Sequence, residues 1–570
     1  MTSSDLYAFN ELEGEETPLT ARSYLVVDYG HSACLVTLYD LVEGRYRLIG
    51  RGEGLNTAGP PWFDISHGLL QAIGQLSDAT GRTLMSLQGQ LIRPTRSDGG
   101  GVDYFGATVS YGNSLRVIVA GLLESASIAS ARKALQSVHA NEVDCFSLAD
   151  ERGRTGQIES VLTNRPDVIF LVGGTDGGAD KQVEDLIVTV AMALELQDEG
   201  TRPAVIYGGN AALRSLVLDS LADLTEVHLV DNVRPTFSTE QIGHAIAMLA
   251  QAYYLTKIAA SDGGGILSDW CNSAPMNSAH AFGGITEYLA AVGQGRVLGL
   301  DVGASQITLV SAVQGQVDLA VRTDMGLGRP VIKLLDQQFL QAVSERPDEE
   351  DVDLDLANYI LDKSSHPSIL PMTRRAVKTE LALAGHMIRR AAADAAAEWS
   401  WPASGSTPEV KALLLRGRVF SSAPNPTESL RAVLDALELK GVFRVLVDRY
   451  SVLPAMGLLA AEDPDMVVQI LRGGALERWA WVVAPENRAR SGDKILTVVM
   501  NSPSLNSIEM DIPYGDIEIL PLPAGEPATL DLQPAPGVDV GAGRGKSRQL
   551  SAMGFAIGLV VDGRVGPSTR

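Results

Sequence analysis

Short apolar runs separated by turn signals dominate the first fifty ordered positions of the chain and return near position 296. In residues 23–52 the runs are β-branched and EGR gives a tight-turn signal, which predicts strand, turn, strand, turn, strand. The stretch RVLGLDVGASQITLVSAVQGQVDLAVRTDMG, which starts at 296, has the same order. Two separate β-meanders are therefore predicted.

Between the meanders, continuous apolar strands alternate with amphipathic helices. The strands are SLRVIVAG, EVDCFSL, DVIFLVG, PAVIYGG and EVHLVD. Strands of unbroken V, I, L and F separated by helices are typical of a parallel sheet covered on both faces. The pattern predicts one doubly wound domain at roughly 107–235, followed by a long helix over 239–260.

Beyond the second meander, the pattern predicts an alanine-rich helix over 372–399, which we expect to pack into the core. A buried strand is expected at 410–420, and a strand, loop and helix after it. From about 490 short strands alternate with Pro/Gly loops, which is typical of a small β domain.

The composition of the chain disfavours some classes of partner and some locations. The 570 residues carry a net charge of -23, and this acidity disfavours nucleic acid. Cys34, Cys145 and Cys271 lack metal-ligand spacing, as expected for reduced thiols of a cytoplasmic protein. No apolar run reaches the roughly 20 residues of a membrane helix, and residues 1–20 are expected to be a disordered acidic tail.

One short motif occurs twice, once in the first turn of each meander. Asp28-Tyr29-Gly30-His31-Ser32 and Asp301-Val302-Gly303-Ala304-Ser305 each follow an apolar strand and precede another. In such D-x-G-x-S turns glycine lets backbone N–H groups approach a phosphate, serine adds a hydrogen bond, and aspartate holds Mg²⁺ through water. Two facing turns would clamp a nucleoside triphosphate. The alternative is that D-x-G is only a common turn signal.

A second glycine cluster lies at the carboxyl end of a predicted parallel strand, where open α/β sheets bind ligands. It comprises Gly173, Gly174, Thr175, Asp176, Gly177 and Gly178. Gly208, Gly209 and Asn210, at the end of another strand, are predicted to line the same crevice. A metal-bound phosphate, a hydroxylated ligand or a hydrogen-bonded partner loop would suit the carboxylate. The alternative is that Asp176 only caps the following helix.

Two further motifs are decoys. GHSAC resembles a serine-hydrolase elbow, but a strand is predicted after it where that elbow opens a helix. GAGRGKS at 541–547 resembles a phosphate-binding loop, but strands are again predicted where a helix is required.

The order of motifs over 23–462 resembles the glutamate mutase accessory (MutL, or GlmL) family of the actin/Hsp70/sugar-kinase ATPase superfamily. VVDYGHS, PDVIFLVGGTDGGAD, PAVIYGGN, DNVRPT, SAPMNSAHAFGGITEYLA and GLDVGASQITLVSAV carry the resemblance. It implies an α/β, actin-like (RNase H-like) ATPase fold with an inserted doubly wound domain and a C-terminal β domain. The expected divisions are 1–20, 21–106 (first lobe), 107–260 (insert), 261–489 (second lobe) and 490–570.

The resemblance also implies a function. It suggests an accessory, reactivating chaperone of a cobalamin-dependent mutase or other protein partner, with ATP and Mg²⁺ as cofactors and with Asp28 and Asp301 on the metal side. Gly30, His31, Ser32, Gly303 and Ser305 would bind phosphates. Separately from the resemblance, a homo-oligomer is one alternative for the state of the chain.

The chain departs from the family pattern at two places. Ala304, Gln306 and Thr308 replace a glycine, a threonine and an aspartate of the second phosphate turn. Leu415-Arg416-Gly417-Arg418 replaces the G-T-G-G adenosine loop, which leaves Gly417 and Arg418 on the adenosine side. Arginine there could contact phosphate, stack on adenine, or fill a pocket that no longer binds nucleotide.

These departures favour a second hypothesis, a degenerate scaffold or assembly protein that does not hydrolyse ATP. A third hypothesis is a small-molecule kinase, which would need a catalytic aspartate, with Asp176 as its candidate.

Overall fold

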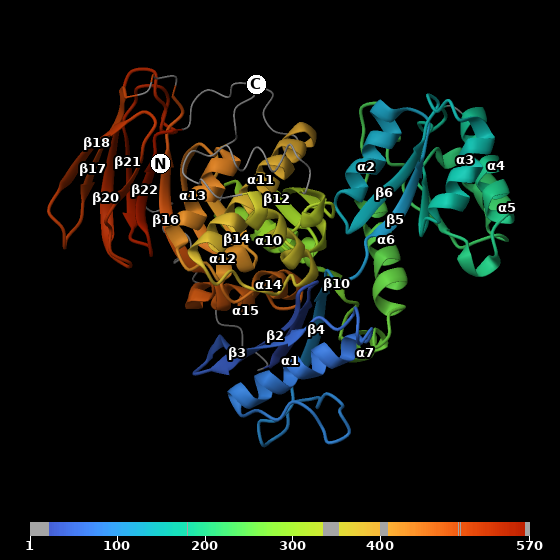
Figure 1. The fold of residues 1–570 in the computed structure, drawn as a ribbon, viewed down its shortest axis with the longest axis horizontal. Helices are drawn as coiled ribbons and strands as arrows, with labels where there is room; N and C mark the ends of the chain where they lie inside the picture. The colour runs from blue at the N-terminus through green and yellow to red at the C-terminus, as the bar shows by residue number, and fades with distance from the viewer. Residues whose placement is uncertain are drawn as a thin grey trace.

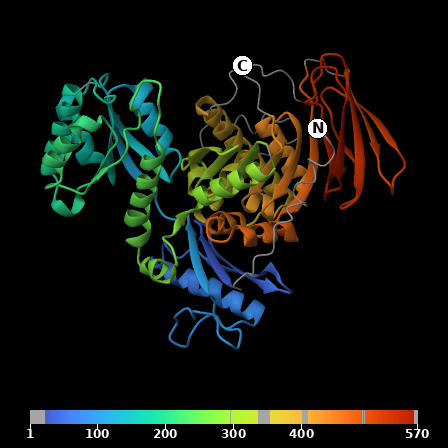
Figure 2. The ribbon, with the colours of Figure 1, turned by 180° about the vertical axis from the view of Figure 1, so that it is seen from behind.

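The computed structural model describes residues 22–178, 180–293, 295–334, 353–399, 409–487, 490 and 492–564. The predicted acidic tail lies outside these residues. Figure 1 shows four parts: a first lobe, an inserted domain, a second lobe and a C-terminal sheet; Figure 2 shows them from behind. No helix in the described residues is both long and apolar enough to cross a membrane.

The first lobe is built on a five-stranded sheet in the order β10-β4-β1-β2-β3. The pairs β1–β2 and β2–β3 are antiparallel, whereas β1–β4 and β4–β10 are parallel. Helix α1 (Ile65–Thr80) packs on β2 and β3. The strands are β1 (Tyr24–Tyr29), β2 (Ala33–Val42), β3 (Arg45–Leu55), β4 (Tyr104–Val109) and β10 (Met276–Asn277).

The second lobe repeats this arrangement, with the strand order β13-β12-β11-β14-β15 and the same sequence of antiparallel and parallel pairs. Both predicted meanders are present, each as the first three strands of its sheet. The doubled topology confirms the actin-like (RNase H-like) fold. The strands are β11 (Val297–Val302), β12 (Ile307–Val313), β13 (Gln316–Arg322), β14 (Ala412–Arg416) and β15 (Gly441–Val447).

The inserted domain leaves the first lobe after β4 and returns before β10. Its five strands are all parallel, in the order β6-β5-β7-β8-β9, which confirms the predicted doubly wound sheet. The strands are β5 (Leu115–Ala120), β6 (Ala140–Phe146), β7 (Val168–Leu171), β8 (Ala204–Tyr207) and β9 (Val227–Leu229). The helices are α2 (Ala129–Leu135), α3 (Gly153–Asn164), α4 (Lys181–Glu195), α5 (Arg214–Leu221) and α6 (Gly243–Tyr253).

The predicted C-terminal β domain is present and continues the second lobe. Strands β16, β22 and β19 extend the second-lobe sheet to eight strands, and β18-β17-β20-β21 form a separate sheet that shares an apolar core with them. The GAGRGKS segment leads into β21, a strand, so it is no helix-linked phosphate loop. These strands are β16 (Glu477–Ala484), β17 (Lys494–Asn501), β18 (Ile508–Pro513), β19 (Ile517–Leu520), β20 (Pro527–Pro534), β21 (Arg548–Met553) and β22 (Gly558–Asp562).

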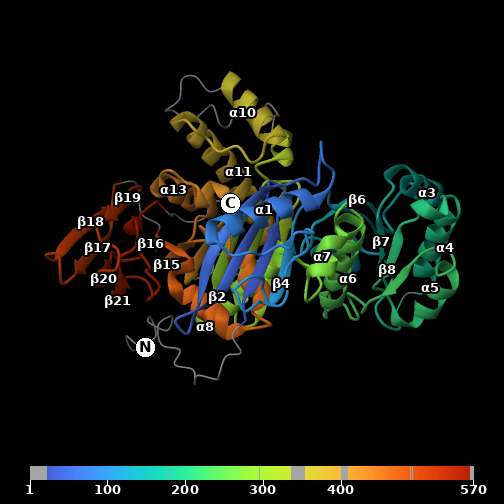
Figure 3. The same cartoon turned by 90° about the horizontal axis from the view of Figure 1, so that it is seen from below.

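The two lobes share a core. Helix α8 (Ser278–Val292) packs on β11 to β13, and α14 (Leu453–Leu459) packs on β1 and β4 as well as on α8. Apolar side chains of both sheets meet these two helices in one cluster. Figure 3 shows the lobes from below with α8 near the strands. The alanine-rich α11 (Arg374–Glu398) contributes to the core of the second lobe, as predicted.

Candidate interlobe site

The two predicted phosphate turns are closed by equivalent backbone hydrogen bonds. Gly30 N donates to Ala33 O at 2.9 Å, and Gly303 N donates to Gln306 O at 3.0 Å. Each turn follows the first strand of its sheet and opens an antiparallel partner strand. After Gly30-His31-Ser32 the chain enters β2 at Ala33, which excludes a serine-hydrolase elbow.

Arg416 joins the aspartates of the two turns. It ends β14, in register with Asp301 of the neighbouring parallel strand. Its guanidinium donates through Nη1 to Asp301 Oδ2 and through Nη2 to Asp28 Oδ2. Its Nε lies 3.9 Å from Asp448 Oδ2. One arginine from the altered adenosine loop therefore contacts carboxylates of both lobes.

Asp448 completes this cluster and was not predicted from the sequence. It follows β15, and its two oxygens accept hydrogen bonds from Val452 N at 2.8 Å and Leu453 N at 2.9 Å. Its side chain is fully buried. The available signal was its place after an apolar strand and before a helix, where a carboxylate caps the helix start.

Burial and mutual attraction set the charges of the cluster. Burial raises the pKa of Asp301, and Arg416 opposes that rise. Burial also raises the pKa of Asp448, to about 6, with Arg416 again opposing. Burial acts to lower the pKa of Arg416, but Asp301, Asp28 and Asp448 raise it overall. The guanidinium is therefore a permanent cation among acidic groups.

These residues do not fit a Mg²⁺–nucleotide in this arrangement. Asp28 Oδ1 already accepts from Thr108 Oγ1 and Ser278 Oγ, both at 2.8 Å, and its Oδ2 accepts from Arg416. A Mg²⁺ ion here would meet the guanidinium charge and carboxylate oxygens that are already engaged. No group of three or more His, Cys, Asp or Glu among the described residues is arranged to hold a metal ion.

Arg418, predicted for the adenosine side, also reaches the first lobe. It forms an ion pair with Glu53 of β3 and donates to Ser368 O at 3.1 Å. Arg51 donates to the same Glu53 at 2.7 Å. Burial lowers the pKa of Arg418, and nearby Arg51 lowers it further. Arg51, Glu53 and Ser368 line a cavity of about 420 Å³ together with Ser32 of the first turn; Ser368 belongs to the second lobe.

His31 lies in the first turn with Nδ1 buried and without a hydrogen-bond partner in the described part of the chain. Burial lowers its pKa to about 4, and His139 and Arg329 contribute to this effect. The uncharged imidazole is consistent with its position between other basic groups.

We expect His31 to make stability fall with acid. Between pH 6.5 and about 4, the unfolded chain binds a proton that the folded site does not, so stability is lost as pH falls. The loss is on the order of 3 kcal/mol, at about 1.4 kcal/mol per pH unit. His31→Gln should remove this part of the pH dependence. Urea unfolding of both proteins should show a constant difference between pH 7 and 8 and a changing one below 6.5; a constant difference throughout would contradict the expectation.

The inserted domain docks on the second turn. His139 Nδ1 hydrogen-bonds Gln306 Oε1, and Gln306 Nε2 donates to Thr308 Oγ1 at 3.2 Å. Two further contacts join the inserted domain to the rest of the chain: Val321 N of β13 donates to Gln136 O, and the His280 side chain of α8 places Nε2 2.7 Å from Ser137 O. Gln306, which departs from the family pattern, therefore contacts the inserted domain directly, and Thr308 accepts a hydrogen bond from the same Gln306 amide.

The predicted crevice of the inserted domain is a closed hydrogen-bond network between three loops. Asp176 Oδ1 accepts from Ala211 N at 3.0 Å and from Asn232 Nδ2 at 2.8 Å. Asn210 Nδ2 donates to Asp180 at 2.7 Å, and Asn210 N donates to Gly173 O at 3.0 Å. Helix α4 begins at Lys181, with Asp180 before it, so the alternative that Asp176 caps the helix is wrong.

The glycines of this crevice allow the backbone conformations and close approaches that the hydrogen-bond network requires. Gly173, Gly174 and Gly177 have positive φ, and a Cβ on Gly209 would lie 2.6 Å from Gly173 O. Gly208 N donates to Leu171 O at 3.0 Å, and Gly178 N donates to Thr175 O at 2.8 Å. Of the interpretations offered for the carboxylate, the hydrogen-bonded partner loop matches these contacts.

Asp176→Ala is expected to loosen this network. It leaves Ala211 N–H and the Asn232 amide without their acceptor, which should cost about 1–3 kcal/mol. Hydrogen exchange should accelerate in 208–213 and 230–236. Asp185→Ala, at an exposed carboxylate of α4, is the matched control. Unchanged exchange in Asp176→Ala would show that the network does not order these loops.

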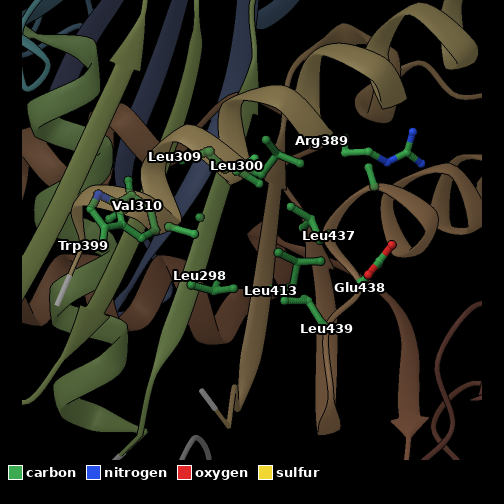
Figure 4. Close-up of a pocket in the computed structure, with 15 residues that line it drawn as sticks. Leu298, Leu300, Leu309, Val310, Arg389, Trp399, Leu413, Leu437, Glu438 and Leu439 are labelled. Atoms are coloured by element: carbon green, nitrogen blue, oxygen red, sulfur yellow. The ribbon is translucent and has the colours of Figure 1, made fainter. Parts of the chain in front are cut away.

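A separate apolar cavity of about 300 Å³ lies in the second lobe between its sheet and α11. Its floor includes Leu298, Leu300 and Leu413; Figure 4 shows Trp399 at one end and Arg389 with Glu438 at the other. Arg389 donates to Asp435 O at 2.9 Å. The apolar floor offers nothing to bind a phosphate.

The doubled fold and its two facing turns define a two-lobed protein of actin-like architecture. The sequence profile described as MutL protein matches residues 24–474, and the chain belongs to this family. Protein MutL of Clostridium tetanomorphum is 24% identical over 411 residues, covering 64% of this chain and 84% of that protein. The match ends before β16, so the C-terminal sheet lies outside it.

Solved structures with a weaker likeness to the chain include an acetone carboxylase and a glycerol dehydratase reactivase. Nucleotide-free acetone carboxylase matches with a TM-score of 0.33 and 12% identity over 87% of this chain and 82% of that one. A glycerol dehydratase reactivase matches with a TM-score of 0.28 and 11% identity over 78% of this chain and 100% of that one. Likeness at this level carries no functional conclusion.

Proposed function

We propose that this protein is an accessory protein of a cobalamin-dependent mutase, and that it acts on this partner through relative movement of its lobes and inserted domain. The family membership suggests the partner class. The observation that supports the mechanism is the contact of His139 with Gln306. Because the inserted domain touches the second turn directly, a change in the interlobe site would alter how that domain is held.

Two versions of this function differ in the role of ATP. ATP-dependent remodelling would require Mg²⁺–nucleotide between the two turns. The contacts of Arg416 favour the non-hydrolysing version instead, in which the protein assembles with its partner without nucleotide turnover. A kinase is disfavoured because Asp176, its candidate base, already accepts two hydrogen bonds inside the inserted domain.

Reactivation of an inactivated cobalamin-dependent mutase from the same organism tests this role. The purified chain should restore turnover, and His139→Ala should reduce the effect while leaving the fold intact by circular dichroism. His244→Ala, on the exposed side of α6, is the control. Equal reactivation with and without Mg-ATP would favour the non-hydrolysing version. The proposal is overturned if the chain forms no complex with the mutase and does not restore its turnover.

A further inference from the structure

We propose that Arg416 is the resident cation of the interlobe site: its guanidinium takes the place of a divalent metal ion, so the lobes are held together without nucleotide. This inference concerns the interlobe site alone and does not rest on the identity of a partner.

The first step is the placement of Arg416. Parallel pairing of β14 with β11 puts it beside Asp301, at the sheet edge where the second turn begins. Its side chain is 12% exposed, and those of Asp28 and Asp301 are 6% and 11% exposed. A buried cation is tolerated only when acidic partners surround it, and Asp28, Asp301 and Asp448 do so here.

Second, most oxygens of the three carboxylates already accept hydrogen bonds. Asp28 accepts from Thr108, Ser278 and Arg416, and Asp448 accepts from two backbone N–H groups. Of the six oxygens in these three carboxylates, only Asp301 Oδ1 accepts no hydrogen bond from the described residues. Mg²⁺ requires near-octahedral oxygen coordination, which this set does not provide while Arg416 is in place.

The third step is that a single short segment supplies two ionic contacts between the lobes. Arg416 reaches Asp28 of β1, and Arg418 reaches Glu53 of β3. Both carboxylates belong to the first lobe and both arginines to the second. In the nucleotide-binding arrangement implied by the family resemblance, metal and phosphates would bridge the lobes; here the protein supplies the bridge.

Titration of the full chain with Mn²⁺, followed by electron paramagnetic resonance, tests the inference. The wild type should bind no Mn²⁺ at this site at millimolar concentration. Arg416→Gly exposes the carboxylates and should bind one Mn²⁺ per chain, at least tenfold more tightly than the wild type. Adding Asp301→Asn should abolish that binding, and Arg449→Gly, which removes an arginine that is 55% exposed, should leave the wild-type result unchanged.

Two results would overturn the inference. One is wild-type Mn²⁺ binding that Asp301→Asn removes. The other is a folded Arg416→Gly variant that binds no Mn²⁺. If that variant does not fold, small-angle scattering of the wild type decides: an unchanged radius of gyration on adding Mg-ATP supports the resident cation, and compaction overturns it. A failed reactivation assay would leave these outcomes unaffected.

Discussion

Gly417→Ala is expected to destabilise the protein by about 3 kcal/mol or more. A Cβ built on Gly417 would lie 2.2 Å from Val302 O and 2.9 Å from Val302 C, both backbone atoms at the end of β11. The residue also has φ of 113°, which an L side chain rarely adopts. Neither the backbone of β11 nor that of β14 can move without disturbing the sheet.

Urea unfolding with Gly441→Ala as control separates the steric clash with Val302 from the strain of a positive φ. Gly441 has φ of 100°, but its nearest neighbour would be Glu409 Cγ at 3.5 Å, so only the backbone strain is present. That control should lose about 1 kcal/mol. Similar losses in both variants would show that the contact with Val302 is not decisive.

Gly417 has a structural reason to be glycine that is independent of nucleotide. The family resemblance predicted Gly417 on the adenosine side because the family carries glycines there. The structure gives it a packing role that persists whether or not nucleotide binds. Its presence is therefore no evidence for an adenosine site.

The parts of the fold that repeat a local pattern could be predicted from the sequence. The two D-x-G-x-S turns lie in β-meanders because apolar strands flank each motif, and the continuous apolar strands between them form the predicted parallel sheet. Local periodicity is sufficient where one face or both faces of a strand are buried.

The contacts of the interlobe site could not be predicted in this way. Arg416 and Asp28 are separated by 388 positions, and the composition of LRGR left phosphate, adenine and pocket filling as alternatives. The sequence likewise left several interpretations of Asp176 open. Its carboxylate accepts hydrogen bonds from loops that are 35 and 56 positions away in the chain. Both sites are defined by tertiary pairing of polar groups, which no local pattern encodes.

Arg416→Met is expected to cost about 3–5 kcal/mol at pH 7, because it leaves the buried carboxylates of Asp28, Asp301 and Asp448 without their cation. Methionine retains much of the side-chain volume, so the loss reports charge more than a cavity. Urea unfolding measures it, and Arg449→Met, at an exposed arginine, should change stability by no more than about 0.5 kcal/mol.

The deficit should shrink as the pH falls. Burial already raises the pKa of Asp301 and Asp448 while Arg416 opposes the rise, so removing Arg416 raises both further. A carboxyl whose folded pKa exceeds its unfolded value stabilises the protein at low pH and loses that contribution as pH rises through the folded pKa. The difference from wild type should therefore be larger at pH 7 than at pH 5.5.

A neutral triple variant tests the electrostatic cause. Asp28→Asn with Asp301→Asn and Arg416→Met removes the cation together with its two directly bonded carboxylates, and it should recover much of the stability lost in Arg416→Met. Recovery would mean that the family's metal-side aspartates are retained here as partners of an arginine. A triple variant as unstable as the single one would show that Arg416 is needed for packing and that its charge is incidental.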